Sequence, residues 1–269
     1  MRYEIIEKQQ ANINKAYDYL FEIYGDRLIN VAAFGSMNYG LASISSDTDI
    51  KAMVCPTLNE VITDTKVNTE FEYSGGKITV KDIRLMIKEY QKKNMNFVET
   101  LFTSFQRWNP LYSSLINDMY VFGCYIGNYD YKRTFTTAQG QLSSVLKKID
   151  SLEPRSQEWK KQLSRGMFIY DFIVKYSIGR QYEECLQAGD LAKDMKLSSN
   201  FFDDFDPADD KDWVIFLQSF RDNMNVEVLT KHRTTFVPAT SFHVVDAESK
   251  KIVKKAIKIL WEKTGDARI

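Results

Sequence analysis

The chain has 269 residues, of which 44% are hydrophobic and 27% are charged, an ordinary globular composition that does not favour disorder. Its 36 Lys and Arg residues balance 36 Asp and Glu residues. This neutral total argues against a strongly basic nucleic-acid binder, although it is compatible with a local basic patch. Cys55, Cys124 and Cys185 form neither a disulfide framework nor a metal-spaced pair, which favours a reducing compartment.

The first residues contain no signal-peptide core, and no apolar run approaches the roughly 20 residues of a membrane span. We therefore expect a cytoplasmic protein without membrane association. Its length allows one large domain or two modest ones.

The first part of the chain predicts helices mixed with strands. Apolar residues three and four apart predict a helix over residues 4–25, and apolar runs predict strands over 28–34 and 50–55. Thr57 and Glu60 form a capping-box pattern for a short helix. Strands over 69–73 and 77–83 flank a glycine turn, and helices are predicted over 84–93 and 96–103.

Beyond the turn at 108–110 the pattern becomes mostly helical. Helices are predicted over 131–149, 156–178, 182–191 and 248–263, and the acidic stretch 203–212 is expected to be a solvated loop. The sequence thus predicts an α+β protein in two domains: residues 1–108 form a small mixed sheet flanked by helices, and residues 109–269 form a mostly helical part.

One stretch, residues 31–55, carries a pattern typical of chemistry. The first strand ends at Gly35-Ser36, and Asp47 and Asp49 lead into the second strand. Residues two apart on a strand share a face, so both carboxylates are expected to project together. Two adjacent carboxylates repel unless a cation lies between them, and a hard divalent ion such as Mg²⁺ is the usual partner for oxygen ligands.

This pattern resembles the active-site signature of the polymerase-β-like nucleotidyltransferases, and Gly35 to Leu41 followed by Ser46-Asp47 resembles a branch of predicted bacterial and phage members. The resemblance implies metal-dependent transfer of a nucleoside monophosphate from a nucleoside triphosphate to an acceptor hydroxyl, with release of pyrophosphate. It implies two Mg²⁺ ions, or Mn²⁺ in their place, bridged by Asp47 and Asp49, and a helical part that closes over the nucleotide.

The family also supplies a third carboxylate from a neighbouring strand, and Asp82 fits that description best. The alternative is that Asp82 caps the helix predicted over 84–93, and both roles suit the end of a strand. The stretch that contains Asn94 and Glu99 resembles an Asn-plus-Glu stretch in relatives of the branch. We expect Glu99 to support the site or the fold from a helix.

The triphosphate needs donors and cations. Gly35 allows a close backbone approach and Ser36 offers a hydroxyl, although an ordinary tight turn would look the same. Arg165 or Lys175 could reach the phosphates, as a Lys or Arg on a helix does in the family, although a solvated surface position is the better explanation for either one taken alone. Tyr39 could stack on a base or pack in the core.

The acceptor stays open: a nucleic-acid end, a small molecule and a protein side chain all suit one active-site motif. The base preference is also open. Two alternatives compete with transfer. One is a catalytically idle relative that binds nucleotides or a partner protein, as an antitoxin-like module would. The other is a phosphotransferase or hydrolase that uses two aspartates for metal.

Overall fold

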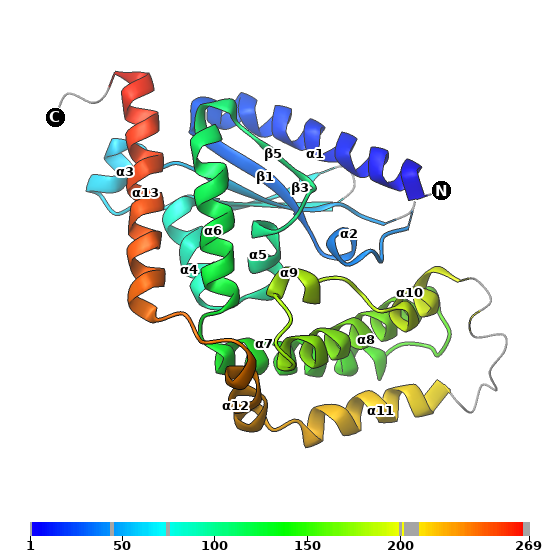
Figure 1. Ribbon diagram of the computed structural model, residues 1–269. Coiled ribbons are helices and arrows are strands. Elements are labelled where there is room, and N and C mark those ends of the chain that lie inside the picture. Colours follow the sequence, from blue (N-terminus) through cyan, green and yellow to red (C-terminus); the bar gives the residue numbers. More distant parts are fainter. Residues whose placement is uncertain (1, 44–45, 74–75, 199–200, 202–209, 266–269) are drawn as a thin grey trace. The chain divides into compact units, whose positions relative to one another are not determined.

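The computed structural model describes residues 2–43, 46–73, 76–198, 201 and 210–265. The fold is α+β, as predicted, with one five-stranded mixed sheet and a mostly helical C-terminal part (Figure 1). Contacts divide the chain into two compact units. Unit 1 contains residues 1–38, 42–129 and 240–269, and unit 2 contains residues 39–41 and 130–239. The boundary expected at residue 108 therefore differs from this division, because η3 (Pro110–Leu115), α6 (Ile116–Gly127) and α13 (Phe242–Thr264) belong to the unit that contains the sheet.

The sheet of unit 1 has the strand order β3-β4-β2-β1-β5, in which β2 and β4 are parallel and all other neighbours are antiparallel. A register shift in β1 between Leu28 and Asn30 places Asn30 opposite Met53 of β2. The strands are β1 (Leu28–Phe34), β2 (Asp49–Val54), β3 (Asn68–Tyr73), β4 (Gly76–Asp82) and β5 (Gln106–Trp108).

Helix α1 (Arg2–Tyr24) covers one face of this sheet, as Figure 1 shows. Its apolar positions, Ile13, Ala16, Tyr17 and Leu20, form a core with alternate residues of β1, β2 and β4. The opposite face carries polar side chains and is approached by α4 (Ile83–Gln91) and α5 (Met95–Val98). The predicted capping box of α3 (Leu58–Ile62) is present, with Thr57 and Glu60 each accepting from the other's backbone N–H.

The remaining elements of unit 1 come from three separate parts of the chain. Helix α13 packs against α6 and the 3₁₀ helix η3. It buries Val245, Ile252, Ala256 and Leu260, and Lys255 ties it to Asp118 at 2.6 Å. These elements are α2 (Ser36–Tyr39), whose last residue belongs to unit 2, η1 (Gly25–Arg27), η2 (Glu99–Leu101), η3 (Pro110–Leu115), α6 (Ile116–Gly127) and α13 (Phe242–Thr264).

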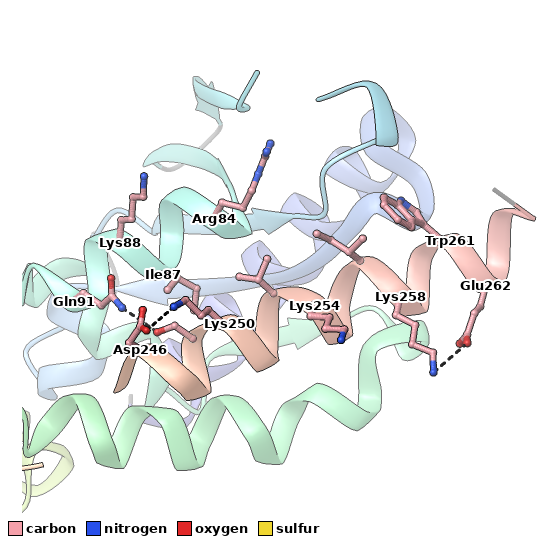
Figure 2. Close-up of a pocket in the computed structure, with 13 residues that line it drawn as sticks. Arg84, Ile87, Lys88, Gln91, Asp246, Lys250, Lys254, Lys258, Trp261 and Glu262 are labelled. Carbon is pink, nitrogen blue, oxygen red and sulfur yellow. Dashed lines mark hydrogen bonds and ion pairs between the residues drawn. The ribbon is translucent and has the colours of Figure 1, made fainter. Parts of the chain in front are cut away.

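A groove of about 680 Å³ runs between α4 and α13 (Figure 2). Its apolar lining comes from Ile87, Val253, Ile257 and Trp261. Its charged lining residues are five cations, Arg84, Lys88, Lys250, Lys254 and Lys258, and two carboxylates, Asp246 and Glu262. The charged residues that line the groove are therefore mostly cations, although the chain as a whole has no net charge.

Unit 2 is built from helices around a core of aromatic rings. The guanidinium of Arg233 is buried over the ring of Tyr176, 3.5 Å from its centroid, and donates to the backbone carbonyls of Tyr176 and Arg180. The helices are α7 (Tyr131–Ile149), α8 (Gln157–Ser177), α9 (Tyr182–Cys185), α10 (Asp190–Leu197), α11 (Asp210–Asn223) and α12 (Val226–Phe236).

The predicted helices over 131–149 and 156–178 are confirmed, whereas the one over 182–191 ends at Cys185 and a separate helix begins at Asp190. Most of the predicted acidic loop, residues 203–209, lies outside the described residues. Asp210, at its end, is not solvated: it is buried and bonded to Arg155 at 2.5 Å. Among the described residues, no helix has the length and apolarity needed to cross a membrane.

Candidate functional site

The two aspartates that precede and begin β2 are oriented by the residue between them. Thr48 is buried, accepts a hydrogen bond from Asn12 Nδ2 at 2.9 Å and donates one to Gln9 Oε1, both on α1. Because successive side chains on a strand point to opposite faces, anchoring Thr48 on the α1 side directs Asp47 and Asp49 to the polar face. Asp47 is exposed and Asp49 is half-buried. The predicted pair of carboxylates on one face is therefore consistent with the register of β2.

The Gly-Ser corner adjoins this acid pair. In the antiparallel ladder Phe34, the last residue of β1, lies opposite Asp49, the first residue of β2. The chain turns at Gly35 with φ +86°, a value that glycine adopts without steric cost. Gly35 and Ser36 are both half-exposed. The corner and the acid pair thus lie at the same edge of the polar face, and ligands can reach both.

Glu99, from η2, holds the corner from inside. Its side chain is fully buried, and Oε2 accepts from the backbone N–H of Gly35 at 2.9 Å and from Nδ2 of Asn38 at 2.9 Å. Asn38 also donates to the Ala33 carbonyl at 3.1 Å and accepts from the Thr103 hydroxyl at 2.5 Å. The expectation that Glu99 supports the site or the fold is met by these contacts.

Lys51 places a positive charge on the same face, two residues after Asp49. Its ammonium donates to the Thr79 hydroxyl at 3.0 Å and lies over the rings of Phe34 and Phe97, 4.2 and 4.5 Å from their centroids. Burial lowers the pKa of Lys51, and the carboxylate of Asp49 opposes that shift. The sequence indicated this residue, since a lysine inside an otherwise apolar strand is unusual, but the Gly-Ser and Asp-x-Asp motifs do not include it.

The start of β4 passes very close to the acid pair. Gly76 has φ +150°, and a Cβ atom built on it would overlap the Thr48 carbonyl oxygen and lie 2.7 Å from the Thr48 carbonyl carbon. The backbone N–H of the next residue, Lys77, donates to Asp49 Oδ1 at 3.4 Å. A side chain at position 76 would push β4 away from Asp49, so this glycine allows the close approach of the two strands.

Asp82 does not join the acid pair, and its assignment as the third carboxylate is wrong. Because β4 runs parallel to β2 in register, Asp82 lies opposite Val54, five residues along the strand from Asp49. At about 3.3 Å per residue this is a separation of about 16 Å. Asp82 is fully buried at the opposite end of β4, where it caps α4 through the Arg84 N–H at 2.7 Å and pairs with the Arg84 guanidinium at 2.6 Å. The capping alternative describes its role.

The β4 positions that adjoin the acid pair carry no carboxylate. Lys77 lies next to Asp49, and Thr79 lies opposite Lys51. Glu70 and Glu72 are one strand further away, on β3, and Glu70 pairs with Lys77 at 3.1 Å. Within the part of the chain that the structure describes, no group of three His, Cys, Asp or Glu residues could hold a metal ion. The protein therefore offers two carboxylates here.

The other predicted nucleotide contacts, Tyr39, Arg165 and Lys175, belong to unit 2. Tyr39 is buried and stacks on Phe168 of α8 with ring centroids 3.9 Å apart, so it packs in the core and its face is not available to a base. Lys175 donates to the Gln187 carbonyl at 2.8 Å, and Arg165 is half-buried on the same helix. Contact of Arg165 or Lys175 with a triphosphate stays a prediction.

No protein-family model matches this chain, and no curated protein is significantly similar to it.

Proposed function

We propose that the protein transfers a nucleoside monophosphate from a nucleoside triphosphate to an acceptor hydroxyl in a metal-dependent reaction. The observation that carries the proposal is the register of β1 with β2, which pairs Phe34 with Asp49 and so joins the Gly35-Ser36 corner to the acid pair. Phosphoryl transfer depends mainly on positioning and on stabilising charge, and this end of the β1–β2 ladder offers two carboxylates for a cation beside the Ser36 hydroxyl for an anion.

The donor set fits Mg²⁺, which is commonly held by one or two carboxylates together with water and substrate phosphates. Asp47 and Asp49 would hold the ion, with Mn²⁺ as an alternative. When bound, the ion supplies positive charge to the phosphate oxygens. Ser36 contributes a hydroxyl for a phosphate oxygen, and Glu99 holds the corner by accepting the Gly35 N–H. The acceptor, a nucleic-acid end, a small molecule or a protein side chain, is not specified by these residues.

A second candidate function, a catalytically idle nucleotide-binding relative, is favoured by one specific observation. The family's third carboxylate is expected from the strand beside Asp49, and β4 presents Lys77 and Thr79 there, while Asp82 lies at the other end. Such a protein would bind the magnesium complex of a triphosphate without turning it over. Pyrophosphate release therefore decides between transfer and binding alone.

Thermal unfolding with each of the four nucleoside triphosphates, with and without MgCl₂, tests nucleotide binding. The proposal predicts a midpoint that rises only with both components and a rise that disappears in Asp47→Asn. The matched control is Asp64→Asn, an exposed aspartate outside the site, which should respond like wild type. Equal responses of the two variants would exclude nucleotide binding at the acid pair.

Turnover is tested by incubating labelled triphosphates with cell extract and following both the label and the phosphate product. Pyrophosphate together with label on one fraction supports transfer and identifies the acceptor. Orthophosphate indicates a hydrolase or phosphotransferase, and binding without product indicates the idle relative. The proposal includes a cytoplasmic location, which the three free cysteines, Cys55, Cys124 and Cys185, support.

A further inference from the structure

A pocket with polar and aromatic lining residues lies on the polar face of the sheet, at the β5 edge of unit 1. It has a volume of about 470 Å³, which is within the range of small-molecule sites. Its lining comes from β1, β5, α4, η3, α6 and the segment around η2, and none of its lining residues is charged. Burying an unpaired charge is costly, so a pocket of this composition suits the neutral part of a ligand.

At the base of this pocket is a buried carboxamide that nothing else in the fold uses. Asn30 is 7% exposed and lines the pocket. No hydrogen bond joins its side chain to another residue that the structure describes. Asparagine is unfavourable in a strand interior, and the other residues of β1 from Leu28 to Ala33 are apolar and buried. With no partner in the fold, the Asn30 amide is left to bond to water or to a ligand in the pocket.

The register of β1 directs this side chain into the pocket. Leu28, Val31 and Ala33 pack in the core beneath α1, and the shift between Leu28 and Asn30 returns Asn30 to the opposite, polar face. There Asn30 lies beside Trp108 of the edge strand β5. A register shift that re-aims one side chain is a feature often found next to functional sites.

The walls of the pocket present aromatic surface. Trp108, Phe102 and Tyr120 contribute rings, and the last two meet edge to face with centroids 6.4 Å apart. The Trp108 indole N–H donates at 2.9 Å to Oε1 of Gln106, another lining residue, and this bond fixes the ring. Aromatic faces beside a carboxamide suit a flat ring with polar edges.

We propose that this pocket binds a neutral planar heterocycle with adjacent donor and acceptor groups, namely the base of a nucleoside. The Asn30 carboxamide offers one donor and one acceptor side by side, the pairing by which asparagine recognises the edge of a base such as adenine. The rings of Trp108 and Tyr120 cover the faces of the base. This site needs neither the acid pair nor a metal, so it goes beyond the function proposed above.

The test uses adenosine, guanosine, cytidine and uridine, which carry no phosphate, in metal-free buffer with isothermal titration calorimetry. At least one should bind saturably with a dissociation constant below about 1 mM, and D-ribose should not bind. Asn30→Leu keeps the side-chain shape and should weaken binding at least tenfold. The matched control, Asn68→Leu, lies on the same row of the sheet on β3, outside the pocket, and should bind like wild type.

A second readout separates binding from a structural role. Because Asn30→Leu removes an amide that has no partner in the fold, its unfolding midpoint should not fall even though binding is lost. Tyr120→Ala, at an exposed position on the rim, should weaken binding without changing the midpoint. Asp47→Asn should retain nucleoside binding, which keeps this result independent of the acid pair.

Three outcomes would overturn the proposal. The first is that no nucleoside binds at about 5 mM, a concentration above the dissociation constant of about 1 mM expected for such ligands. The others are unchanged binding in Asn30→Leu and a lower unfolding midpoint in that variant. Binding of D-ribose alone would also exclude a site for the base.

Discussion

At the residue scale, the Asp82 carboxylate belongs to the packing of unit 1. It is fully buried, caps α4 and pairs with Arg84, and the same guanidinium donates to the Thr65 carbonyl at 2.6 Å. Removing one partner of a buried ion pair leaves the other charge uncompensated. The role of Asp82 is thus to join β4, α4 and the segment that precedes β3.

We expect Asp82→Asn to lower the free energy of unfolding by about 2–4 kcal/mol, measured by urea denaturation, since the cap can persist but the charge pair cannot. The magnesium-dependent response to nucleoside triphosphates should remain. Asp64→Asn, which removes an exposed carboxylate 3.8 Å from the same Arg84, should leave the free energy of unfolding almost unchanged. A stable Asp82→Asn protein that lost its metal response would return Asp82 to catalysis.

Asp82 shows what a local pattern can and cannot predict about a single residue. An aspartate at the end of a strand suits both a cap and a metal ligand, and only the parallel register with β2 decides which end of the sheet it occupies. That register depends on residues far apart in the sequence. The sequence did contain the pattern for a helix cap at Asp82. It also contained two polar residues inside apolar runs, Asn30 and Lys51, and both are buried in the fold.

At the scale of elements, the approach of β4 to β2 depends on Gly76. We expect Gly76→Ala to lower the free energy of unfolding by about 2–3 kcal/mol, because the new Cβ would overlap the Thr48 backbone and the backbone angle is unfavourable for other residues. The displacement should also weaken any metal–nucleotide binding at Asp49. Gly140→Ala, in an exposed turn of α7 with no neighbour within 4 Å, should instead stabilise by about 0.5–1 kcal/mol.

The packing of α10 on α8 includes a lysine whose charge opposes folding. Burial, with a smaller contribution from nearby Lys161, lowers the pKa of Lys196 to about 8, and Glu158 opposes the shift. Since the unfolded chain keeps this proton up to an ordinary pKa of about 10.4, it binds more protons than the folded chain between those values. The cost of the buried charge is fully present below pH 8 and is relieved as the pH rises toward 10.5.

We therefore expect Lys196→Met to raise the free energy of unfolding at pH 7 by about 1–3 kcal/mol, with the advantage shrinking steadily as the pH rises to about 10. Urea titrations at several pH values measure the difference between variant and wild type. Lys193→Met, on the same helix, serves as control. It loses only a long pair with Asp190 at 3.7 Å, and should change stability little and equally at all pH values. A constant advantage of Lys196→Met across this range would contradict the explanation.

Elements with a strong local pattern were predictable, and those defined by distant contacts were not. Residues close together in the sequence determine the apolar periodicity of α1, α7, α8 and α13. The same holds for the capping box of α3. By contrast, β5 has three residues and exists because it pairs with β1, and α11 and α12 pack only part of their surface into unit 2. A turn signal at residues 108–110 therefore suggested a boundary that the contacts place at 129–130.

At the scale of the whole molecule, the return of residues 240–269 to unit 1 is a long-range feature with an electrostatic consequence. It brings the lysine row of α13 beside Arg84 and Lys88 of α4, around the groove of Figure 2. Two of these lysines are already paired, Lys250 with Asp246 at 2.7 Å and Lys258 with Glu262 at 3.5 Å. Arg84 is also paired, with the buried Asp82 at 2.6 Å. Among the described residues, Lys88 and Lys254 remain without an ion pair and leave this surface positive, while the chain as a whole is neutral with a pI of about 6.8.

Net charge alone predicts that the protein passes through a sulfonate cation-exchange column at pH 7.5, since that pH lies above its pI. We expect retention at low salt instead, because fixed charges within a Debye length of about 10 Å at 0.1 M act together. The double variant Lys254→Glu and Lys258→Glu should elute in the void. The double variant Lys147→Glu and Lys148→Glu, at exposed positions of α7, changes the total charge equally and should be retained longer than the first. Equal elution of the two variants would mean that total charge, and not the groove, governs retention.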